Sequence, residues 1–501
     1  MSRARSDASS SSNPGWAARI GEMPILFPAL LGIATLLAIV FALPVIARMP
    51  AHISLDYGEG WNGYWTATAM SGAPLYVKGR ALTGNNYPPL SFYLNGLVGR
   101  WLVGDYIVAG RIVATLSMVA VAGLIARIVR LLGGAGRWAY AAALVFLLYN
   151  LVYLQKFAGV DNPQWLGQAF MLGGLLPLLK QNGEGLGWRA CFLSDATMIL
   201  GGLVKHNQFA LPISVALWLA GTDRRALLRW LACAIGLAAL ACAVLAALYG
   251  QAIFAELLGF KRTLDPHGLR AGLGKSGCMA ALVVVALLGM WRRGSDPRWG
   301  VIALYALLGF VLGALQRIGA GVYVNAHDDG LIGLCALCGV FLGTSASGVL
   351  PRPAGPQLRA ALLLLLLAPI LAVSPHHVTK AIGGLEELPA TRAQWKLLIA
   401  DVRDAPGPVY CEVLAACLWA GRPMQIDFFA YGQKLRTGTD PAPLRRLITE
   451  RRAAMFVLDR AFGEKHGERR LTPDLAALIR ANYRQVREVP KKVDELIPAT
   501  R

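Results

Sequence analysis

Long apolar segments dominate the pattern of hydrophobic and polar positions along the chain. Runs such as 25–47, 231–248 and 360–373 contain no charged residue, and ~20 apolar residues are enough for a helix to cross the hydrocarbon core of a bilayer. The pattern predicts eleven such helices, near residues 24–47, 106–128, 137–156, 162–179, 190–204, 207–221, 230–252, 276–291, 299–317, 329–347 and 359–374. We therefore expect a membrane all-α protein built as a polytopic bundle of about eleven transmembrane helices.

Two segments near the start of the chain, before and after the first apolar run, are more polar than the predicted helices. Residues 1–22 are rich in serine and carry three arginines, which predicts a disordered cytoplasmic tail before a polytopic domain at 23–376. The first external loop, residues 48–105, is much longer than the usual ~2–8 residues between bundled helices, so we expect it to be functional. Within this loop, residues 88–103 have apolar positions at helical spacing, which predicts an amphipathic helix lying in the membrane interface.

The composition changes after residue 376. The last 125 residues hold 21 basic and 15 acidic side chains and contain no run long enough to span a bilayer. Short apolar runs at Val409–Val413 and Ala453–Leu458 predict buried strands, whereas 440–451 and 473–481 have helical spacing. We expect residues 377–501 to form a small extracytoplasmic α/β soluble domain.

The distribution of charge supports this arrangement. The chain is 55% hydrophobic and 16% charged, whereas a soluble domain has roughly a quarter charged residues. Its net charge of +20 comes from basic clusters in the short segments that eleven crossings place in the cytoplasm, as the positive-inside rule expects. These clusters include Arg127, Arg130 and Arg137, then Arg224, Arg225 and Arg229, then Arg292, Arg293 and Arg298. The pattern predicts membrane lipids as partners and no nucleic acid, with the N-terminus cytoplasmic and the C-terminus outside.

Cysteines give little sign of a metal site. Cys335 and Cys338 have the spacing of a ligand pair, but they lie in an apolar helix without a second pair, so core packing is the better interpretation. Cys411 and Cys417 are in the soluble segment. They would pair in an oxidising compartment only if their Cα atoms approach within ~7 Å, which six residues of separation leaves open.

Two carboxylates open the long first loop. Asp56 and Glu59 lie in the segment 55–61 beside glycines and aromatic residues. Acidic side chains at a membrane surface are often merely solvated, but the length of the loop favours a site. A carboxylate here is suited to accept a proton from an acceptor as that acceptor attacks another molecule. We expect both residues at the surface of a polar cleft, where neutral isosteres would lower activity without reducing the inserted protein.

Several short motifs resemble a known family. Asp56-Tyr57-Gly58-Glu59-Gly60 is followed by Ala73-Pro74-Leu75-Tyr76, Asn86-Tyr87-Pro88-Pro89-Leu90 and Ala109-Gly110-Arg111, and further downstream by Val160-Asp161-Asn162-Pro163, Lys205-His206-Asn207-Gln208 and Gly321-Val322-Tyr323-Val324-Asn325. In this order they resemble GT-C fold glycosyltransferases, in the bacterial branch similar to protein mannosyltransferases and lipid A aminoarabinose transferases. Many relatives have an adjacent Asp-Glu pair in the first loop, whereas this chain has Gly58-Glu59 and an aspartate three residues earlier.

The resemblance implies a function and a location. It implies a glycosyltransferase of the bacterial inner (plasma) membrane that moves a hexosyl or pentosyl group from a polyprenyl-phosphate-sugar donor to a lipid, glycan or protein acceptor. It also implies an external active site with a catalytic carboxylate in the first loop. Either Asp56 or Glu59 suits this role, and Asp161 is a further candidate, although its position equally suits a helix cap.

The departing phosphate requires cations or oriented donors. Lys205, His206, Arg262 and Arg270 are external in the predicted topology, and Lys205 is a candidate phosphate ligand that would also suit the role of a membrane anchor. The family motifs add the remaining candidates for substrate binding, which are Tyr87, Asn207 and Asn325.

Two alternatives stay open from the sequence. A polytopic transporter or lipid flippase would share the helices and the charge, but transporters usually place ionisable groups at mid-membrane. A non-catalytic scaffold would make the carboxylates dispensable. No cofactor is certain: His327, Asp328 and Asp329 with His267 have side chains that bind divalent cations, but turn residues before a helix explain them better.

Overall fold

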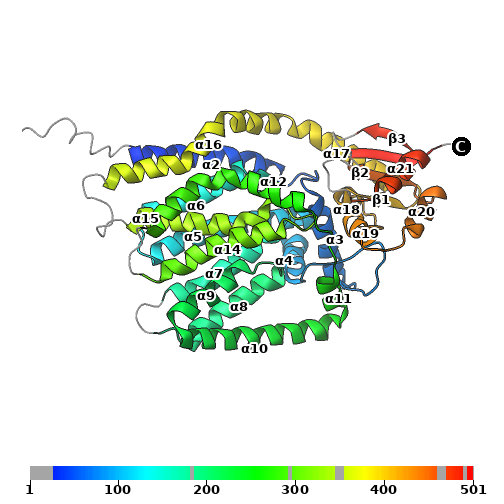
Figure 1. Ribbon diagram of the computed structural model, residues 1–501. Coiled ribbons are helices and arrows are strands. Elements are labelled where there is room, and N and C mark those ends of the chain that lie inside the picture. The colour runs from blue at the N-terminus through cyan, green and yellow to red at the C-terminus, as the bar shows by residue number, and fades with distance from the viewer. Residues whose placement is uncertain are drawn as a thin grey trace, which may run out of the picture.

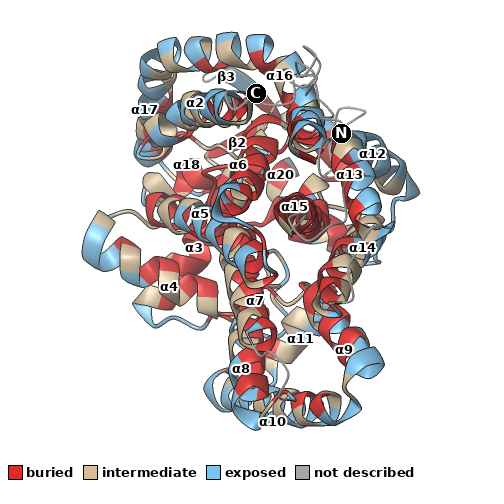
Figure 2. Cartoon of the chain, turned by 90° about the vertical axis from the view of Figure 1, so that its left-hand side faces the viewer, coloured by how far each residue is buried: buried red, intermediate tan, exposed pale blue. Residues whose placement is uncertain are grey.

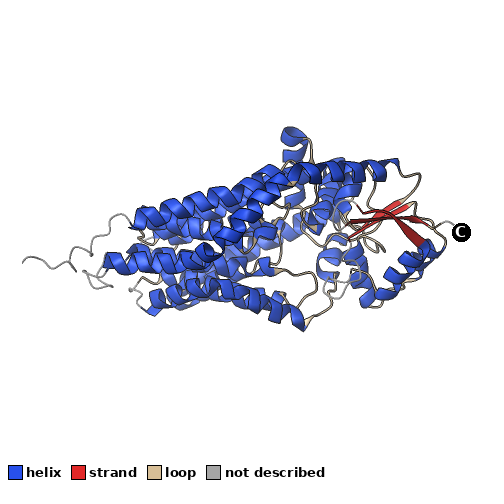
Figure 3. Cartoon of the chain, turned by 90° about the horizontal axis from the view of Figure 1, so that it is seen from above, coloured by secondary structure: helices blue, strands red, loops and turns tan. Residues whose placement is uncertain are grey.

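The computed structural model describes residues 26–180, 185–291, 296–344, 355–459, 470–488 and 493–499. The predicted tail at 1–22 and the residues Arg292 and Arg293 lie outside these ranges. The chain is elongated, with a bundle of long helices at one end and a small sheet at the other (Figures 1 and 3).

Each of the eleven predicted segments contains a helix within its described residues. The bundle consists of α2 (Leu26–Arg48), α5 (Tyr106–Leu131), α6 (Gly136–Val152), α7 (Gln164–Leu179), α8 (Trp188–Val204), α9 (Ala210–Thr222), α10 (Arg224–Tyr249), α12 (Pro266–Ser276) with α13 (Ala280–Trp291), α14 (Arg298–Gln316), α15 (Asp328–Thr344) and α16 (Gly355–Glu386). In the described residues, seven stretches are long and apolar enough to span a membrane, and α6 and α9 are apolar but shorter. The protein is thus polytopic, while the predicted count of eleven crossings is not confirmed.

The pattern of buried and exposed side chains in the bundle is the one expected for a protein surrounded by lipid. The central helix α15 is buried on almost every side (Figure 2), which is typical of an apolar helix in the middle of a bundle. Peripheral helices instead expose large apolar side chains, as α2 does with Ile33, Leu36 and Ile39. Lipid is the solvent that makes such exposure favourable.

The first loop contains two helices and a short π-helix. Helix α3 (Tyr57–Ser71) begins at Asp56, and α4 (Leu90–Val98) continues into the π-helix η1 (Gly99–Val103). The predicted helix within 88–103 is therefore confirmed. Its end exposes Leu97, Trp101 and Leu102, as expected for a helix that rests in a membrane interface.

The C-terminal segment forms the expected α/β unit. It contains α17 (Leu388–Asp404), β1 (Val409–Cys411), α18 (Leu414–Trp419), α19 (Phe428–Arg436), α20 (Ala442–Thr449), β2 (Met455–Asp459), α21 (Pro473–Asn482), β3 (Tyr483–Glu488) and β4 (Val493–Pro498). The strand order is β1-β2-β4-β3, with β1 and β2 parallel and the other pairs antiparallel. The predicted strands and helices are confirmed, whereas residue 376 lies inside α16 and not between two elements.

The sheet separates two apolar cores, because successive side chains of a strand point to opposite faces. Val409, Cys411 and Val457 pack with α17, α18 and the aromatic residues of α3. Tyr410 and Phe456 pack on the other face with α19, α20 and α21. The first of these cores joins the C-terminal domain to the loop that carries Asp56.

Candidate functional site

A pocket of about 380 Å³ lies where the bundle meets the C-terminal domain. Six separate parts of the chain line it: the first loop, the segment 157–164 before and at the start of α7, the segment 205–208 after α8, the segment 257–262 before α12, the segment 316–329 between α14 and α15, and the start of α19. Residues far apart in sequence thus meet at one polar cavity. A concave site with a few convergent polar groups is the form that small-molecule sites usually take.

Asp56 lies at the surface of this pocket, as predicted. It is the residue that caps the N-terminus of α3, and its Oδ1 accepts a hydrogen bond from the Gly58 amide at 2.9 Å. Its Oδ2 lies 3.1 Å from the ammonium of Lys156. The helix cap orients the carboxylate, while the lysine is half exposed and can move away.

Glu59 occupies a different environment, and the prediction that it lies at the surface of the cleft is wrong. Its side chain is fully buried, and its two oxygens accept from Arg111 Nε at 2.7 Å and Arg111 Nη2 at 2.8 Å. The same oxygens accept from the backbone amides of Leu55 and Asp161. Because a buried carboxylate is tolerated only when it is paired and hydrogen-bonded, Glu59 has a structural position here.

Arg111 completes this buried ion pair. Its guanidinium also donates to the carbonyl oxygens of Ala51 and Ile53, which precede Asp56 in the chain. The pair therefore fixes the entry into the first loop. Sequence reasoning placed Arg111 in a motif but gave it no partner.

Asp161 lies beside this ion pair and not in the pocket. Its side chain is 1% exposed, its Oδ1 accepts from Asn95 at 3.2 Å, and its Oδ2 has no partner among the described residues. Burial, and then the negative charge of Glu59, raise the pKa of Asp161 well above its usual value. The adjacent Asn162 lines the pocket and accepts from the amide of Gln164, whereas the N-cap residue of α7 is Pro163, so Asp161 is not the helix cap.

Three of the four predicted basic residues lie in the pocket wall. Lys205, His206 and Arg262 all line it. Lys205 is only 6% exposed, and within the described part of the chain its ammonium has no ion pair and no hydrogen bond; its Nζ lies 5.7 Å from the centre of the Tyr87 ring. The nearby carboxyl groups of Asp328 and Asp329 interact with this charge but do not bind it directly, so its N–H groups are available to an anionic ligand.

Arg262 and His206 are held more firmly. Arg262 donates to the carbonyl oxygen of Ala320 at 3.0 Å, and its guanidinium carbon lies 5.7 Å from the ring centres of both Phe260 and Phe429. Burial, with the positive charges of Lys205 and Arg262, lowers the pKa of His206, so its imidazole is neutral near pH 7. A neutral imidazole can donate one hydrogen bond and accept another.

The remaining predicted binding residues divide into two groups. Tyr87, Asn207 and Asn325 line the pocket, and Asn207 donates to the side-chain oxygen of Gln316 at 2.7 Å. Arg270 is exposed on α12 and is not part of the pocket lining. The structure therefore does not bring Arg270 together with the other cations.

Several pocket groups lack a protein partner in the described chain. Among them are the Nδ1 of His206, the Oδ1 of Asn207 and the Oε1 of Gln208. Buried polar atoms usually have a partner, so these three can serve a polar ligand.

The acidic and histidine residues before α15 do not form a metal cage. His327 ends a 3-10 turn (Val324–His327), Asp328 and Asp329 begin α15, and His267 is exposed on α12. In the described ranges, no three His, Cys, Asp or Glu side chains gather in a way that could hold a metal ion. Asp329 instead accepts a hydrogen bond from Tyr305 at 2.6 Å.

Sequence reasoning missed two contributions to the site. Lys156 lies in a 3-10 turn before Asp161 and was not singled out, although its charge next to the loop motif was a signal. Asp427 and Phe429 come from the C-terminal domain and line the pocket. Nothing in the local sequence of α19 indicated that it would reach the first loop.

By sequence, the chain matches no family model and no curated protein. By structure, it is similar to ArnT from Cupriavidus metallidurans in the apo state, with a TM-score of 0.59 and 15% identity over 92% of this chain and 97% of that chain. The same protein bound to undecaprenyl phosphate gives 0.57 and 14%, over 93% and 98%.

A second similar structure is the oligosaccharyltransferase of Archaeoglobus fulgidus tethered to an acceptor peptide that contains the NVT sequon. It gives a TM-score of 0.54 and 12% identity over 95% of this chain and 74% of that chain. These neighbours are GT-C fold glycosyltransferases and polytopic membrane proteins. The likeness extends over the bundle, the first loop and the C-terminal domain together, and the chain therefore has the GT-C fold.

Proposed function

We propose that the protein is a membrane glycosyltransferase that moves a sugar from a polyprenyl-phosphate donor to an extracytoplasmic lipid, polysaccharide or protein acceptor. The observation that carries this proposal is the cationic side chain of Lys205, which has no hydrogen bond or ion pair within the described chain, in the same pocket as the Asp56 carboxylate. One group suits the phosphate of the donor, and the other suits the proton of the acceptor.

The reaction assigns a role to each of these groups. Asp56 accepts the proton of an acceptor hydroxyl or amine while that acceptor forms a bond to the anomeric carbon. The bond from the anomeric carbon to the phosphate oxygen breaks, and its electron pair stays on the departing polyprenyl phosphate. Lys205 and Arg262 stabilise the charge that develops there, as positioned cations do most strongly in a site shielded from water.

The neutral groups of the pocket suit the sugar. His206, Asn207 and Asn325 present side chains that can donate and accept hydrogen bonds. Tyr87 presents an aromatic ring. Such groups bind sugar hydroxyls without competing for the phosphate, so we assign them to sugar recognition.

Two neighbours support the proposed partners. ArnT was crystallised with undecaprenyl phosphate, and the archaeal oligosaccharyltransferase was crystallised with a tethered acceptor peptide. They make a polyprenyl-linked donor and a lipid or protein acceptor the first classes to test on this chain.

The proposed location is the inner membrane of a bacterium, with the N-terminus cytoplasmic and the pocket outside. Helix α5 begins at Asp105, which contacts Trp419 of the C-terminal domain, and ends at Leu131. Its basic residues Arg127 and Arg130 therefore lie at the end remote from the pocket, where the positive-inside rule expects cytoplasm.

A transporter or flippase is not favoured. The polar groups meet at the end of the bundle, and the C-terminal domain forms part of the pocket wall, whereas transporters usually bind near mid-membrane. A non-catalytic scaffold would not require the cation of Lys205 and the carboxylate of Asp56 to line the same pocket.

The decisive experiment supplies purified protein with polyprenyl-phosphate sugars labelled in the sugar, together with membrane extracts that contain acceptors. We expect release of polyprenyl phosphate and label on the acceptor, both lost in Asp56→Asn. Movement of intact donor across vesicles without cleavage would contradict the proposal and support a flippase.

A further inference from the structure

Asp56 is the N-cap residue of helix α3, and the contacts of the C-terminal domain with this helix include three places near its start. These places are Tyr57, Gly60 and Tyr64, which lie along the first two turns of α3. The groups that contact α3 at these three places belong to the C-terminal domain and not to the transmembrane bundle. The bundle holds α3 through the ion pair of Glu59 and Arg111, and the C-terminal domain adds its contacts from more than 300 residues away in the chain.

The contact nearest to Asp56 is made by Tyr57. Its hydroxyl donates to Asp427 Oδ1 at 2.9 Å and accepts from the amide of Phe429 at 3.1 Å. Asp427 is 3% exposed and also accepts from the amide of Ala430 at 3.0 Å, so it caps α19 with the same oxygen. The tyrosine hydroxyl therefore links the start of α3 to the start of α19.

The ring of Tyr57 is held as well. The guanidinium carbon of Arg470 lies 4.1 Å from its ring centre, and Arg470 pairs with the buried Glu412 at the end of β1. A cation over an aromatic face is favourable, more so when water is excluded. Ring and hydroxyl are thus fixed by two different elements of the C-terminal domain.

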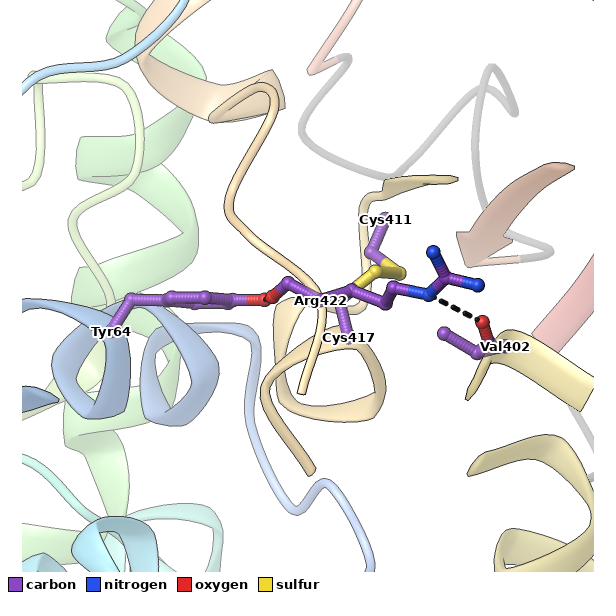
Figure 4. Close-up of a disulfide and its surroundings, with 5 residues drawn as sticks. All are labelled: Tyr64, Val402, Cys411, Cys417 and Arg422. Carbon is purple, nitrogen blue, oxygen red and sulfur yellow. Dashed lines mark hydrogen bonds between the residues drawn. A yellow bond between two sulfur atoms is a disulfide. The ribbon is translucent and has the colours of Figure 1, made fainter. Parts of the chain in front are cut away.

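The second and third contacts lie on the same side of α3. A Cβ atom added at Gly60 would lie 2.2 Å from the amide nitrogen of Ala415, which shows that α3 and α18 pack backbone against backbone. The hydroxyl of Tyr64 donates to the carbonyl oxygen of Arg422, and Arg422 is itself anchored by its Nε on the carbonyl oxygen of Val402 at 3.1 Å (Figure 4).

A disulfide reinforces this surface. Cys411 and Cys417 are bonded, with Cα atoms 6.1 Å apart, and the bond ties β1 to α18 beside Arg422 (Figure 4). The pairing that the sequence left open is thus present. It fixes the element on which α3 rests.

We propose that the C-terminal domain is a positioning part of the active centre, which holds α3 and with it the Asp56 carboxylate through the contact between Tyr57 and Asp427. This inference rests on the proposed role of Asp56. A displacement of about 1 Å is enough to lower turnover ~10²-fold when geometry controls the reaction. Tyr57 and Asp427 act through Asp56, and they are positioning residues in this sense.

The test uses the purified full chain with the labelled donor. Tyr57→Phe keeps the ring beneath Arg470 and removes only the hydroxyl. We expect kcat to fall about 10-fold, as a partial displacement of Asp56 would cause, with the KM for the donor within about twofold, because Lys205 and Arg262 are untouched. Asp427→Ala should show the same split, and Asp427→Asn, which retains an accepting oxygen, should be at least about fivefold more active than Asp427→Ala.

A double-mutant cycle shows whether the two residues act as a pair. If they do, Tyr57→Phe combined with Asp427→Ala should be no worse than Asp427→Ala alone. Arg445→Met is the matched control, since Arg445 makes an exposed ion pair with Asp474 in the same domain, away from the pocket lining. Its kcat should be unchanged.

Hydrogen exchange decides the structural half of the inference without any activity. Tyr57→Phe should increase exchange in the first turns of α3, residues 57–64, whereas Arg445→Met should not. Unchanged exchange, a kcat equal to wild type, or additive losses in the double mutant would each overturn the inference. Absence of turnover in the wild-type chain would instead defeat the proposed function, and the exchange result would still judge the contact.

Discussion

Two carboxylates of the first loop, Asp56 and Glu59, lie in different environments, one on the pocket face of the loop and the other on its buried face. Asp56 faces a pocket, with one oxygen on a helix cap and the other on a half-exposed lysine. Glu59, three positions later, faces the protein interior and shares both oxygens with the buried Arg111. The two residues are similar in type and lie close together in sequence. The difference between them therefore comes from the partners that the tertiary structure supplies.

This comparison separates reactivity from stability. A carboxylate with an exchangeable partner at a pocket can accept a proton from a substrate. A carboxylate bound by an arginine inside the protein cannot do so without breaking the ion pair, which would leave an uncompensated charge. Mutations on the two faces should therefore fail in different ways.

The largest effect is expected on the buried face. Arg111→Met leaves Glu59 without its partner, and breaking a buried pair by removing one member costs about 3–5 kcal/mol. We expect much less folded protein in the membrane and a lower unfolding temperature in detergent. Glu59→Gln should be folded in smaller amounts than wild type, and normal amounts of both variants would refute the structural assignment.

The pocket face should show the opposite behaviour. Asp56→Asn keeps the shape of the side chain and its ability to cap α3, but it removes the base. We expect turnover to fall by roughly 10²-fold or more, with the amount of inserted protein and its thermal stability unchanged. Near-normal transfer by Asp56→Asn in single-turnover assays would remove Asp56 from the chemistry and erase the contrast with Glu59.

Lys205 tests the anion side of the same pocket. Lys205→Met preserves the apolar stem and removes a charge-assisted hydrogen bond, which is typically worth about 1.5–3 kcal/mol. The KM for the donor should rise about 10-fold to 100-fold while the protein remains folded. Arg270→Met, on the exposed surface of α12, is the control and should leave the donor KM within about twofold; equal effects of the two changes would speak against Lys205 as the phosphate ligand.

The smallest effect is expected at Lys156. Its ion pair with Asp56 is half exposed on the lysine side, and such pairs are worth about 0–1 kcal/mol. Lys156→Met should therefore change turnover by less than about fivefold in either direction. A loss as large as that of Asp56→Asn would show that Lys156 takes part in the chemistry, and it would extend the reactive face beyond the first loop.

The sequence by itself determined the elements and the solvent. Apolar runs such as 231–248 have no other favourable environment than lipid, and the short apolar run Val409–Val413 predicts a buried strand. The motifs also singled out Asp56 and Lys205, and the predicted topology singled out Arg262, because a charge that interrupts an apolar chain stands out without knowledge of its neighbours.

The tertiary structure decided which of these charges meet. Glu59 and Arg111 are 52 positions apart, Tyr57 and Asp427 are 370 apart, and no local pattern records such pairs. The folded surroundings of a side chain determine whether it is buried and which groups it meets. The same type of carboxylate is therefore a candidate base in a pocket and a member of a structural ion pair in a core. That choice depends on distances in space, and a linear pattern of residue types does not contain them.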